Sequence, residues 1–183
     1  MKQSTTELRL KFTTNVINVI TFKVATQFSK VMELAQEIKQ TKPFRNPTQQ
    51  AVVNIMYTNN WLCTRQTRIF KKFGISLQQY NVLRILKGHS PEPIMINGII
   101  DRMLDKMSNA SRLVDKLVQK KLVVRNYRQT DRRACDVVIS EEGIHLLEKI
   151  SKELAKMEDS IDGLSAEESL ELNRLLDKFR NTH

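Results

Sequence analysis

Small and reactive residue types are scarce in this sequence of 183 residues, which contains five glycines, four prolines, two cysteines and one tryptophan. The glycines form no phosphate-binding loop, and no glycine–serine nucleophile elbow occurs. The histidines, His89, His145 and His183, are far apart and do not form a spaced ligand set with the cysteines. The sequence therefore predicts neither an enzyme nor a metal or cofactor site.

The cysteines and the apolar runs limit where the protein is expected to work. Cys63 and Cys135 are too few for a disulfide framework, and the sequence shows no secretory signal pattern. No run of about 18 uncharged apolar residues is present, so no transmembrane helix is expected. These features predict a cytoplasmic protein without a membrane partner.

Positive charge is concentrated in the middle of the chain, which has a net charge of +10. Residues 72–140 carry thirteen basic and six acidic side chains, whereas residues 141–183 carry six basic and eleven acidic ones. A locally basic segment favours a polyanionic partner, most simply nucleic acid. A solvated basic surface has the same composition, so charge alone does not decide between the two.

Apolar residues at helical spacing predict a helix over residues 48–72, and Gly74 is suited to end it. Ser76-Leu-Gln-Gln79 is typical of a capping box for a following helix over residues 77–87. Upstream, residues 32–40 are predicted to be helical and Pro43 and Pro47 to interrupt the chain.

Two short helices follow, and together they predict a helix-turn-helix. Asn97 is expected to cap the first and Ser108 the second, with residues 105–107 as the turn between them. The second helix has an apolar stripe on one side and a basic face on the other, formed by Arg112, Lys116 and Lys120.

Alternating apolar residues predict two paired strands after this helix, with residues 128–133 as a basic loop between them. A long helix is expected to begin after Ser140 and to end at Gly163. Ser165-Ala-Glu-Glu168 is typical of a capping box for the last helix. That helix is expected to direct its apolar residues inward, namely Leu172, Leu175, Leu176 and Phe179. The terminal helices carry more apolar surface than one small lobe can cover, which favours packing against a second copy.

Four motifs resemble the MarR family of bacterial winged-helix repressors. In chain order they are Ser111-Arg-Leu-Val-Asp-Lys-Leu-Val, Lys121-Leu-Val-Val-Arg125, Asp131-Arg-Arg133 and Ile139-Ser-Glu-Glu-Gly143. The Asp-Arg-Arg motif alone is weakly specific, but it is strong when joined to the others in this order and spacing. The resemblance covers about residues 48–179. It implies an obligate homodimer that binds pseudo-palindromic operators and is often released by a small molecule or an oxidant.

The domain organisation follows from this resemblance. Residues 48–74 are expected to form a dimerisation helix, residues 75–140 a winged-helix DNA-binding lobe, and residues 141–183 C-terminal dimerisation helices. Residues 1–47 are an N-terminal extension. Two interpretations remain open for residues 1–31: an over-extended gene model whose true start is Met32, or a genuine, loosely docked helix.

A dimer would present two recognition helices to successive major grooves of double-stranded DNA. The residues near the N-terminus of each helix reach base edges first, where asparagine can pair with adenine and arginine with guanine. The predicted contacts in this region are Ser108, Asn109, Ser111 and Arg112. For Ser108 the alternative is a helix cap, and for Arg112 it is a surface salt bridge with Asp115 or Asp101.

Two further groups are predicted to contact DNA. Lys116 and Lys120 lie further along the helix and are expected to contact phosphates, with a solvated face as the alternative. In the wing, the resemblance assigns Arg132 to the minor groove, while Asp131 and Arg133 would shape the loop. The alternative for these three wing residues is a charged turn that has no DNA contact.

Regulation is less well defined by the sequence. Tyr57, Trp61, Phe70 and Tyr80 are candidates to line a ligand pocket, with simple core packing as the alternative. Cys63 is a candidate oxidant sensor, although its place in a helix beside an apolar stripe also suits an inert thiol. Cys135 fits a small core residue.

The sequence thus predicts a mainly α winged helix-turn-helix lobe with a two-stranded β wing, together with N- and C-terminal helices that form a dimerisation region. The predicted function is a homodimeric transcriptional repressor released by a small-molecule effector. The alternatives are a helical protein-interaction module with a basic face and an activator built on the same fold.

Overall fold

The computed structural model describes residues 33–127 and 135–181. The described residues fall into two compact units, which divide between residues 57 and 58. In the first unit, α2 (Leu34–Glu37) is a single helical turn that buries Leu34. It is shorter than the helix predicted over residues 32–40.

The longest helix, α3 (Pro47–Lys72), begins in the first unit and continues into the second. Pro47 occupies its first position, where a missing N–H costs nothing, and the Asn46 side chain accepts from the Gln49 N–H at 2.8 Å. At the other end Gly74 adopts a φ of 67°, a left-handed conformation that glycine tolerates. The helix predicted over residues 48–72, and its termination at Gly74, are confirmed.

The next helix, α4 (Leu77–His89), is held at its start by the predicted capping box. The Ser76 hydroxyl accepts from the Gln79 N–H, and the Gln79 side chain accepts from the Ser76 N–H, both at 3.1 Å. The helix then buries Leu83 and Leu86 in the core, as its spacing predicts, whereas Tyr80 is only half-buried.

The helix-turn-helix consists of α5 (Ile96–Arg102) and α6 (Ala110–Gln119), and both predicted caps are wrong. Asn97 lies inside α5, because the chain enters this helix directly from a strand that ends at Met95. Asn109, rather than Ser108, caps α6: its Oδ1 accepts from the Arg112 N–H at 3.0 Å.

The sheet has three antiparallel strands in the order β1-β3-β2. The predicted ribbon is confirmed as β2 (Val123–Tyr127) and β3 (Cys135–Ile139), with Val123 opposite Ile139. The third strand, β1 (Ile94–Met95), was not predicted, because two residues are too few to show an alternating pattern.

After the sheet come α7 (Glu141–Asp159) and α8 (Ala166–Arg180). Ser140 caps α7 and the Ser165–Glu168 capping box begins α8, both as predicted. α7 ends before Gly163, with Ser160 as its C-cap, so Gly163 lies in the connection between the helices. No residue of α8 is buried, so the expectation that this helix packs inward within the chain is wrong.

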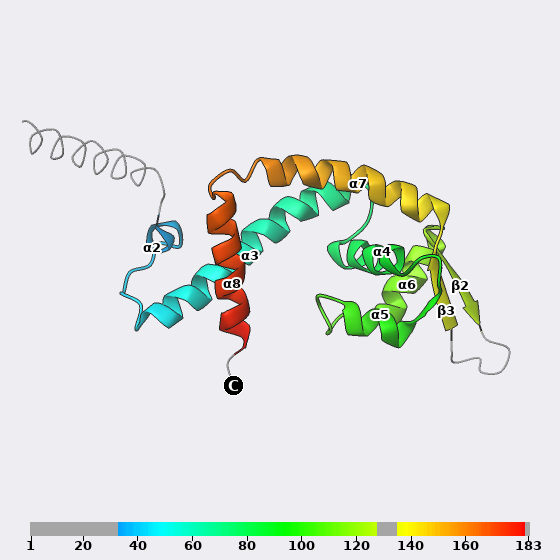
Figure 1. Ribbon diagram of the computed structural model, residues 1–183, viewed down its shortest axis with the longest axis horizontal. Helices are drawn as coiled ribbons and strands as arrows, with labels where there is room; N and C mark the ends of the chain where they lie inside the picture. The colour runs from blue at the N-terminus through cyan, green and yellow to red at the C-terminus, as the bar shows by residue number, and fades with distance from the viewer. Residues whose placement is uncertain (1–32, 128–134, 182–183) are drawn as a thin grey trace, which may run out of the picture. The chain divides into compact units, whose positions relative to one another are not determined.

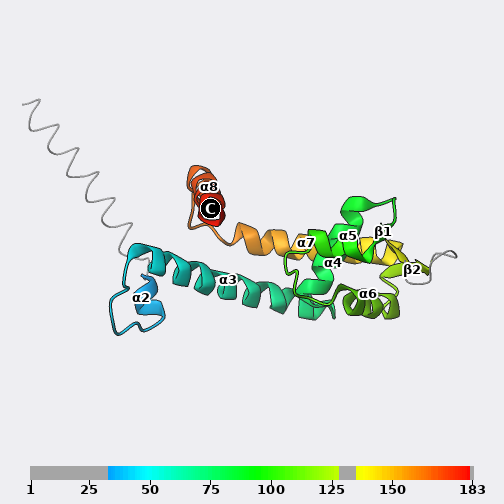
Figure 2. The same ribbon diagram turned by 90° about the horizontal axis from the view of Figure 1, so that it is seen from below.

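One apolar core joins α4, α5, α6, the sheet and α7, and Ile69 and Phe70 near the end of α3 belong to it. Figure 1 shows how the backbones of α4, α5, α6 and the strands are grouped. A quarter-turn of the view keeps α4, α5, α6 and the strands together as one group (Figure 2). Gly143 lies so close to the sheet that an added Cβ would meet the Leu122 carbonyl oxygen at 2.2 Å. The second unit therefore contains a mainly helical winged helix-turn-helix fold, and the predicted fold class is confirmed. Within the described ranges, no helix is long and apolar enough to cross a membrane.

Candidate nucleic-acid interface

The two faces of α6 have different surroundings. Its apolar face is covered by the chain itself: Ala110, Val114 and Leu117 are at most 2% exposed. Its opposite face is exposed and carries Ser111 and Arg112 in the first turn. The helix is thus fixed through its apolar face while its polar face remains free for a partner.

Arg112 and Lys116 are available on this exposed face. Across residues 33–127 and 135–181, neither side chain takes part in an ion pair. The salt bridge with Asp115 that could have occupied Arg112 does not form, because Asp115 pairs with Arg125 of β2. Ser111 is also exposed on the same turn.

The side chains of Ser108 and Asn109 take part in local hydrogen bonds. The Ser108 hydroxyl donates to Asp105 Oδ2 at 2.6 Å, and the Met107 N–H donates to Asp105 Oδ1 at 3.0 Å. These two bonds lower the pKa of the Asp105 carboxyl below its ordinary value. Because Asn109 Oδ1 already caps α6, bidentate pairing with adenine would have to share that oxygen.

Lys120 does not project as a free phosphate contact. Its ammonium donates to the Gly74 carbonyl oxygen and lies 3.3 Å from Gln79 Oε1. Gln79 is a buried polar residue that is 4% exposed. These two acceptors direct the side chain to the junction between α3 and α4, where they compete with a phosphate for the ammonium, and the phosphate contact at Lys120 stays a prediction.

The wing is connected to α6 through its first strand. Arg125 of β2 pairs with Asp115 of α6 and donates from Nε to the Cys135 sulfur at 3.0 Å. Sequence reasoning missed this pair, although opposite charges on the helix and on the strand that follows it were a usable signal. The predicted wing residues Asp131, Arg132 and Arg133 lie outside the described residues.

The four aromatic residues proposed to line a ligand pocket have different environments. Phe70 is 1% exposed and its ring stacks at 4.8 Å on that of Tyr80, so these two belong to the core. Trp61 is 42% exposed and contacts the Arg65 guanidinium at 4.8 Å, and Tyr57 is exposed on α3.

An open groove of about 510 Å³ lies elsewhere, between α4 and α7, and sequence reasoning missed it. It is lined by Arg84, Lys87, Gly88, Ile144, Leu147, Glu148, Ser151 and Lys152. The three basic side chains and one carboxylate favour an anionic occupant.

The two cysteines differ in accessibility. Cys135 is buried on β3, as predicted for a small core residue, and Cys63 is half-buried, with its thiol 3.7 Å from Asn59 Oδ1. In the part of the chain that the structure describes, no group of three histidine, cysteine or carboxylate side chains is arranged to hold a metal.

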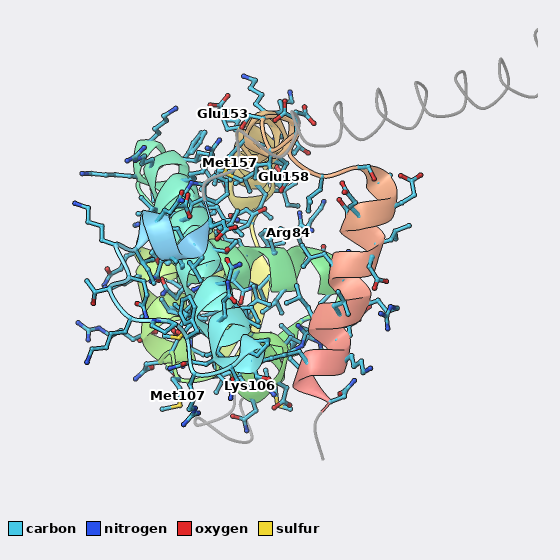
Figure 3. All side chains as sticks on the ribbon, turned by 90° about the vertical axis from the view of Figure 1, so that its left-hand side faces the viewer. Arg84, Lys106, Met107, Glu153, Met157 and Glu158 are labelled. Atoms are coloured by element: carbon cyan, nitrogen blue, oxygen red, sulfur yellow. The ribbon has the colours of Figure 1, made fainter. Side chains whose placement is uncertain are left out.

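The turn before α6 lies away from the acidic residues of α7 that Figure 3 labels. Figure 3 shows Lys106 and Met107 of this turn on the other side of the lobe from Glu153 and Glu158. Glu153 is paired with Lys72 and Lys156, so charge alone does not separate the two sides. The exposed face of α6 is the candidate interface because, among the described residues, Arg112 and Lys116 have no ion-pair partner there and can meet a polyanion.

Comparisons with known proteins point in the same direction. Residues 73–134 match the family model described as MarR family. The HTH-type transcriptional regulator MhqR of Bacillus subtilis is 33% identical over 101 residues, which span 55% of this chain and 68% of MhqR. A MarR transcription factor from Planctomyces limnophilus superposes with a TM-score of 0.57 and 31% identity over 74% of this chain and 98% of that one. The S. aureus MepR–DNA complex gives a TM-score of 0.62 at 23% identity, covering 69% and 93% of the two chains.

Proposed function

Because the chain belongs to the MarR family of DNA-binding transcription regulators, we propose that it is a repressor that binds a pseudo-palindromic operator as a homodimer and releases it when a small molecule binds. In this proposal residues 75–140 bind DNA, and residues 48–74 and 141–183 form the dimer. Residues 1–47 precede these parts as an extension.

The observation that carries the proposal is the orientation of α6. Its apolar face is covered by the core, and its exposed face offers Ser111, Arg112 and Lys116 without a competing ion pair among the described residues. A guanidinium at the start of a helix can pair with guanine in the major groove, and a lysine one turn later can contact a phosphate. Ser108 and Asn109 support this contact mainly by shaping the start of the helix.

Dimerisation is supported by the apolar side chains that the chain leaves exposed. One face of α8 is apolar and exposed. Its side chains Leu172, Leu175 and Phe179 are between 40% and 47% exposed. Such a face is stabilised when a symmetric copy covers it. Two copies would space their recognition helices about 34–36 Å apart, one turn of the duplex.

The wing and the groove complete the proposal. Arg132 would enter an A·T-rich minor groove, whose narrow width concentrates negative potential, while Asp131 and Arg133 shape the loop. We place the effector in the groove between α4 and α7, where Arg84, Lys87 and Lys152 would attract an anion. An effector bound there would act on α4, which packs against α6.

The test is a fluorescence-anisotropy titration of the purified chain on the intergenic DNA beside its own gene, against scrambled DNA of the same length and at two salt concentrations. The proposal expects tight, salt-sensitive and site-selective binding with two protomers per site. Binding that ignores sequence and responds little to salt would instead favour a protein-interaction module. A reporter gene under the same operator separates a repressor from an activator.

A further inference from the structure

The turn between α5 and α6 exposes two large apolar side chains. Met107 is 95% exposed and Leu104 is 87% exposed, the highest values among the large apolar residues that the structure describes. Met103, next to Leu104, is by contrast buried at 3% exposed and anchors the turn in the core. The outward position of Leu104 and Met107 is therefore a local feature and does not reflect a detached segment.

Hydrogen bonds fix the turn in this conformation. The Leu104 N–H donates to Asn81 Oδ1 of α4 at 3.1 Å, which ties the first residue of the turn to the lobe. Asp105 accepts from the Met107 N–H and from the Ser108 hydroxyl, which closes the turn on itself. The backbone is thus held so that Met107 points away from the core before any partner binds.

The place of Met107 in the chain indicates what it meets. It lies two residues before Asn109, the N-cap of α6, and the residues at this end of a recognition helix approach the base edges first. Lys106 and Arg112 near Met107 are basic, and the neighbouring Asp105 carboxylate is bound to the Met107 N–H and the Ser108 hydroxyl, so the two basic side chains can meet a polyanion. In the major groove the apolar group displayed by base pairs is the thymine C5-methyl.

We propose that Met107 determines part of the operator sequence by packing against a thymine methyl group in the major groove. This inference rests on the proposed DNA-binding function and adds a specificity-determining residue to it. Methionine suits the contact because its unbranched, polarizable side chain adapts to the surface it meets. Without DNA, the exposed methionine gains no comparable apolar contact.

The experiment removes the methyl group from the DNA and the side chain from the protein in turn. The titration described above identifies the operator. Each thymine in its half-sites is then replaced, one at a time, by deoxyuridine, which lacks only the methyl group. We expect one position per half-site at which this replacement weakens binding about fourfold, the value of one buried methyl-sized group.

In the Met107→Ala variant this penalty should disappear, because the partner of the methyl is gone. Met107→Leu should keep most of it, since the apolar contact is retained. Leu170→Ala is the matched control, because it removes an apolar side chain that is 70% exposed on α8. Leu170 is distant in the chain from the DNA-binding residues and lies on the side of α8 opposite the apolar face proposed for the dimer, so the variant should leave the full penalty in place.

The outcomes separate this inference from the function on which it rests. Selective operator binding that is indifferent to every thymine methyl, or a penalty that persists in Met107→Ala, overturns the role of Met107 alone. A chain without any site-selective binding overturns the proposed function and this inference with it.

Discussion

The helices α6 and α8 are both amphipathic, yet they are used in opposite ways. α6 has 10 residues and buries three of them, whereas α8 has 15 residues and buries none. The apolar face of α6 is covered by its own chain, and its polar face is exposed. On α8 the apolar face is itself exposed, with Leu175 at 47% and Phe179 at 40%.

This difference shows that an apolar stripe predicts a buried face without saying which molecule buries it. For α6 the covering surface lies within the same lobe, so its outward side is left for a polar partner. For α8 we infer that the covering surface is a second copy of the chain. On this inference, α6 contacts DNA and α8 mediates self-association.

The largest effect is expected from a charge placed on the apolar face of α8. Leu175→Asp should convert the dimer to a monomer, because an unpaired buried charge costs about 3–5 kcal/mol and the symmetric interface would contain it twice. Sedimentation equilibrium gives the mass, and anisotropy should show operator affinity falling together with it.

Leu170→Asp is the control for this experiment, because the same charge is added to the opposite side of the same helix. Leu170 is 70% exposed, so the variant should remain dimeric. If Leu175→Asp is also dimeric, α8 does not form the interface and the contrast with α6 disappears.

The next effect in size concerns the buried face of α6. Leu117 is fully buried, so Leu117→Ala should lower the free energy of unfolding by about 2–5 kcal/mol through the cavity it leaves. Leu175→Ala, studied at concentrations where the chain is monomeric, should change this free energy far less. Equal losses in urea titrations would mean that both helices pack within the chain.

A smaller effect is expected from the exposed face of α6. Arg112→Ala should weaken binding to the specific site by about 1–3 kcal/mol and relax the preference for one base pair. Competition between operator variants that differ at single base pairs measures the preference. Unchanged discrimination would remove Arg112 from the residues that read the sequence.

Two lysines, Lys116 within α6 and Lys120 at its C-cap, allow a finer test of which side chains face DNA. A plot of the logarithm of the binding constant against the logarithm of the salt concentration measures the number of phosphate contacts. Lys116→Met should make the slope of this plot shallower by about one unit for each copy of the chain, because one phosphate contact is lost. Lys120→Met should leave that slope unchanged but lower the ratio of specific to non-specific affinity, since Lys120 holds α6 against the α3–α4 junction. Equal changes in slope would show that Lys120 also contacts a phosphate.

The smallest effect concerns the turn before α6 and depends on pH. The Ser108 hydroxyl and the Met107 N–H lower the pKa of the Asp105 carboxyl in the folded chain. The stability that this carboxylate contributes is therefore complete at pH values above its pKa in the unfolded chain. It is lost as the pH falls through its lower pKa in the folded chain. No change is therefore expected near neutral pH. Ser108→Ala should raise the pKa toward its ordinary value, as measured by an NMR titration of the carboxyl carbon. An unchanged pKa would mean that the hydroxyl does not bind Asp105 in solution.

Local signals allowed much of this fold to be predicted. The capping boxes at Ser76 and Ser165 depend on residues within one helical turn, and both formed as predicted. The predictions failed where distant contacts decide. β1 exists because Ile94 pairs with Val137 on β3, and this pairing places Asn97 inside α5 instead of at its cap.

The candidate site was predictable to a similar degree. The basic face of α6 followed from its spacing, and Arg112 and Lys116 are exposed on it. The choice between Ser108 and Asn109 as the cap depended on Asp105, which binds the Ser108 hydroxyl. The direction of Lys120 depended on carbonyl and amide acceptors that lie more than 40 residues earlier in the chain, which no local pattern contains.

The two attachments of α6 to its surroundings have a consequence for protein engineering. Asp115 of α6 is held by Arg125 of β2, and Lys120, the C-cap of α6, is held by the Gly74 carbonyl oxygen just after α3, so these two positions belong to the scaffold. A transplant of DNA specificity between relatives should therefore exchange residues 107, 111, 112 and 116 and keep 115 and 120 from the recipient. If the whole helix were transplanted, the donor side chains at positions 115 and 120 would enter a chain that lacks their own partners.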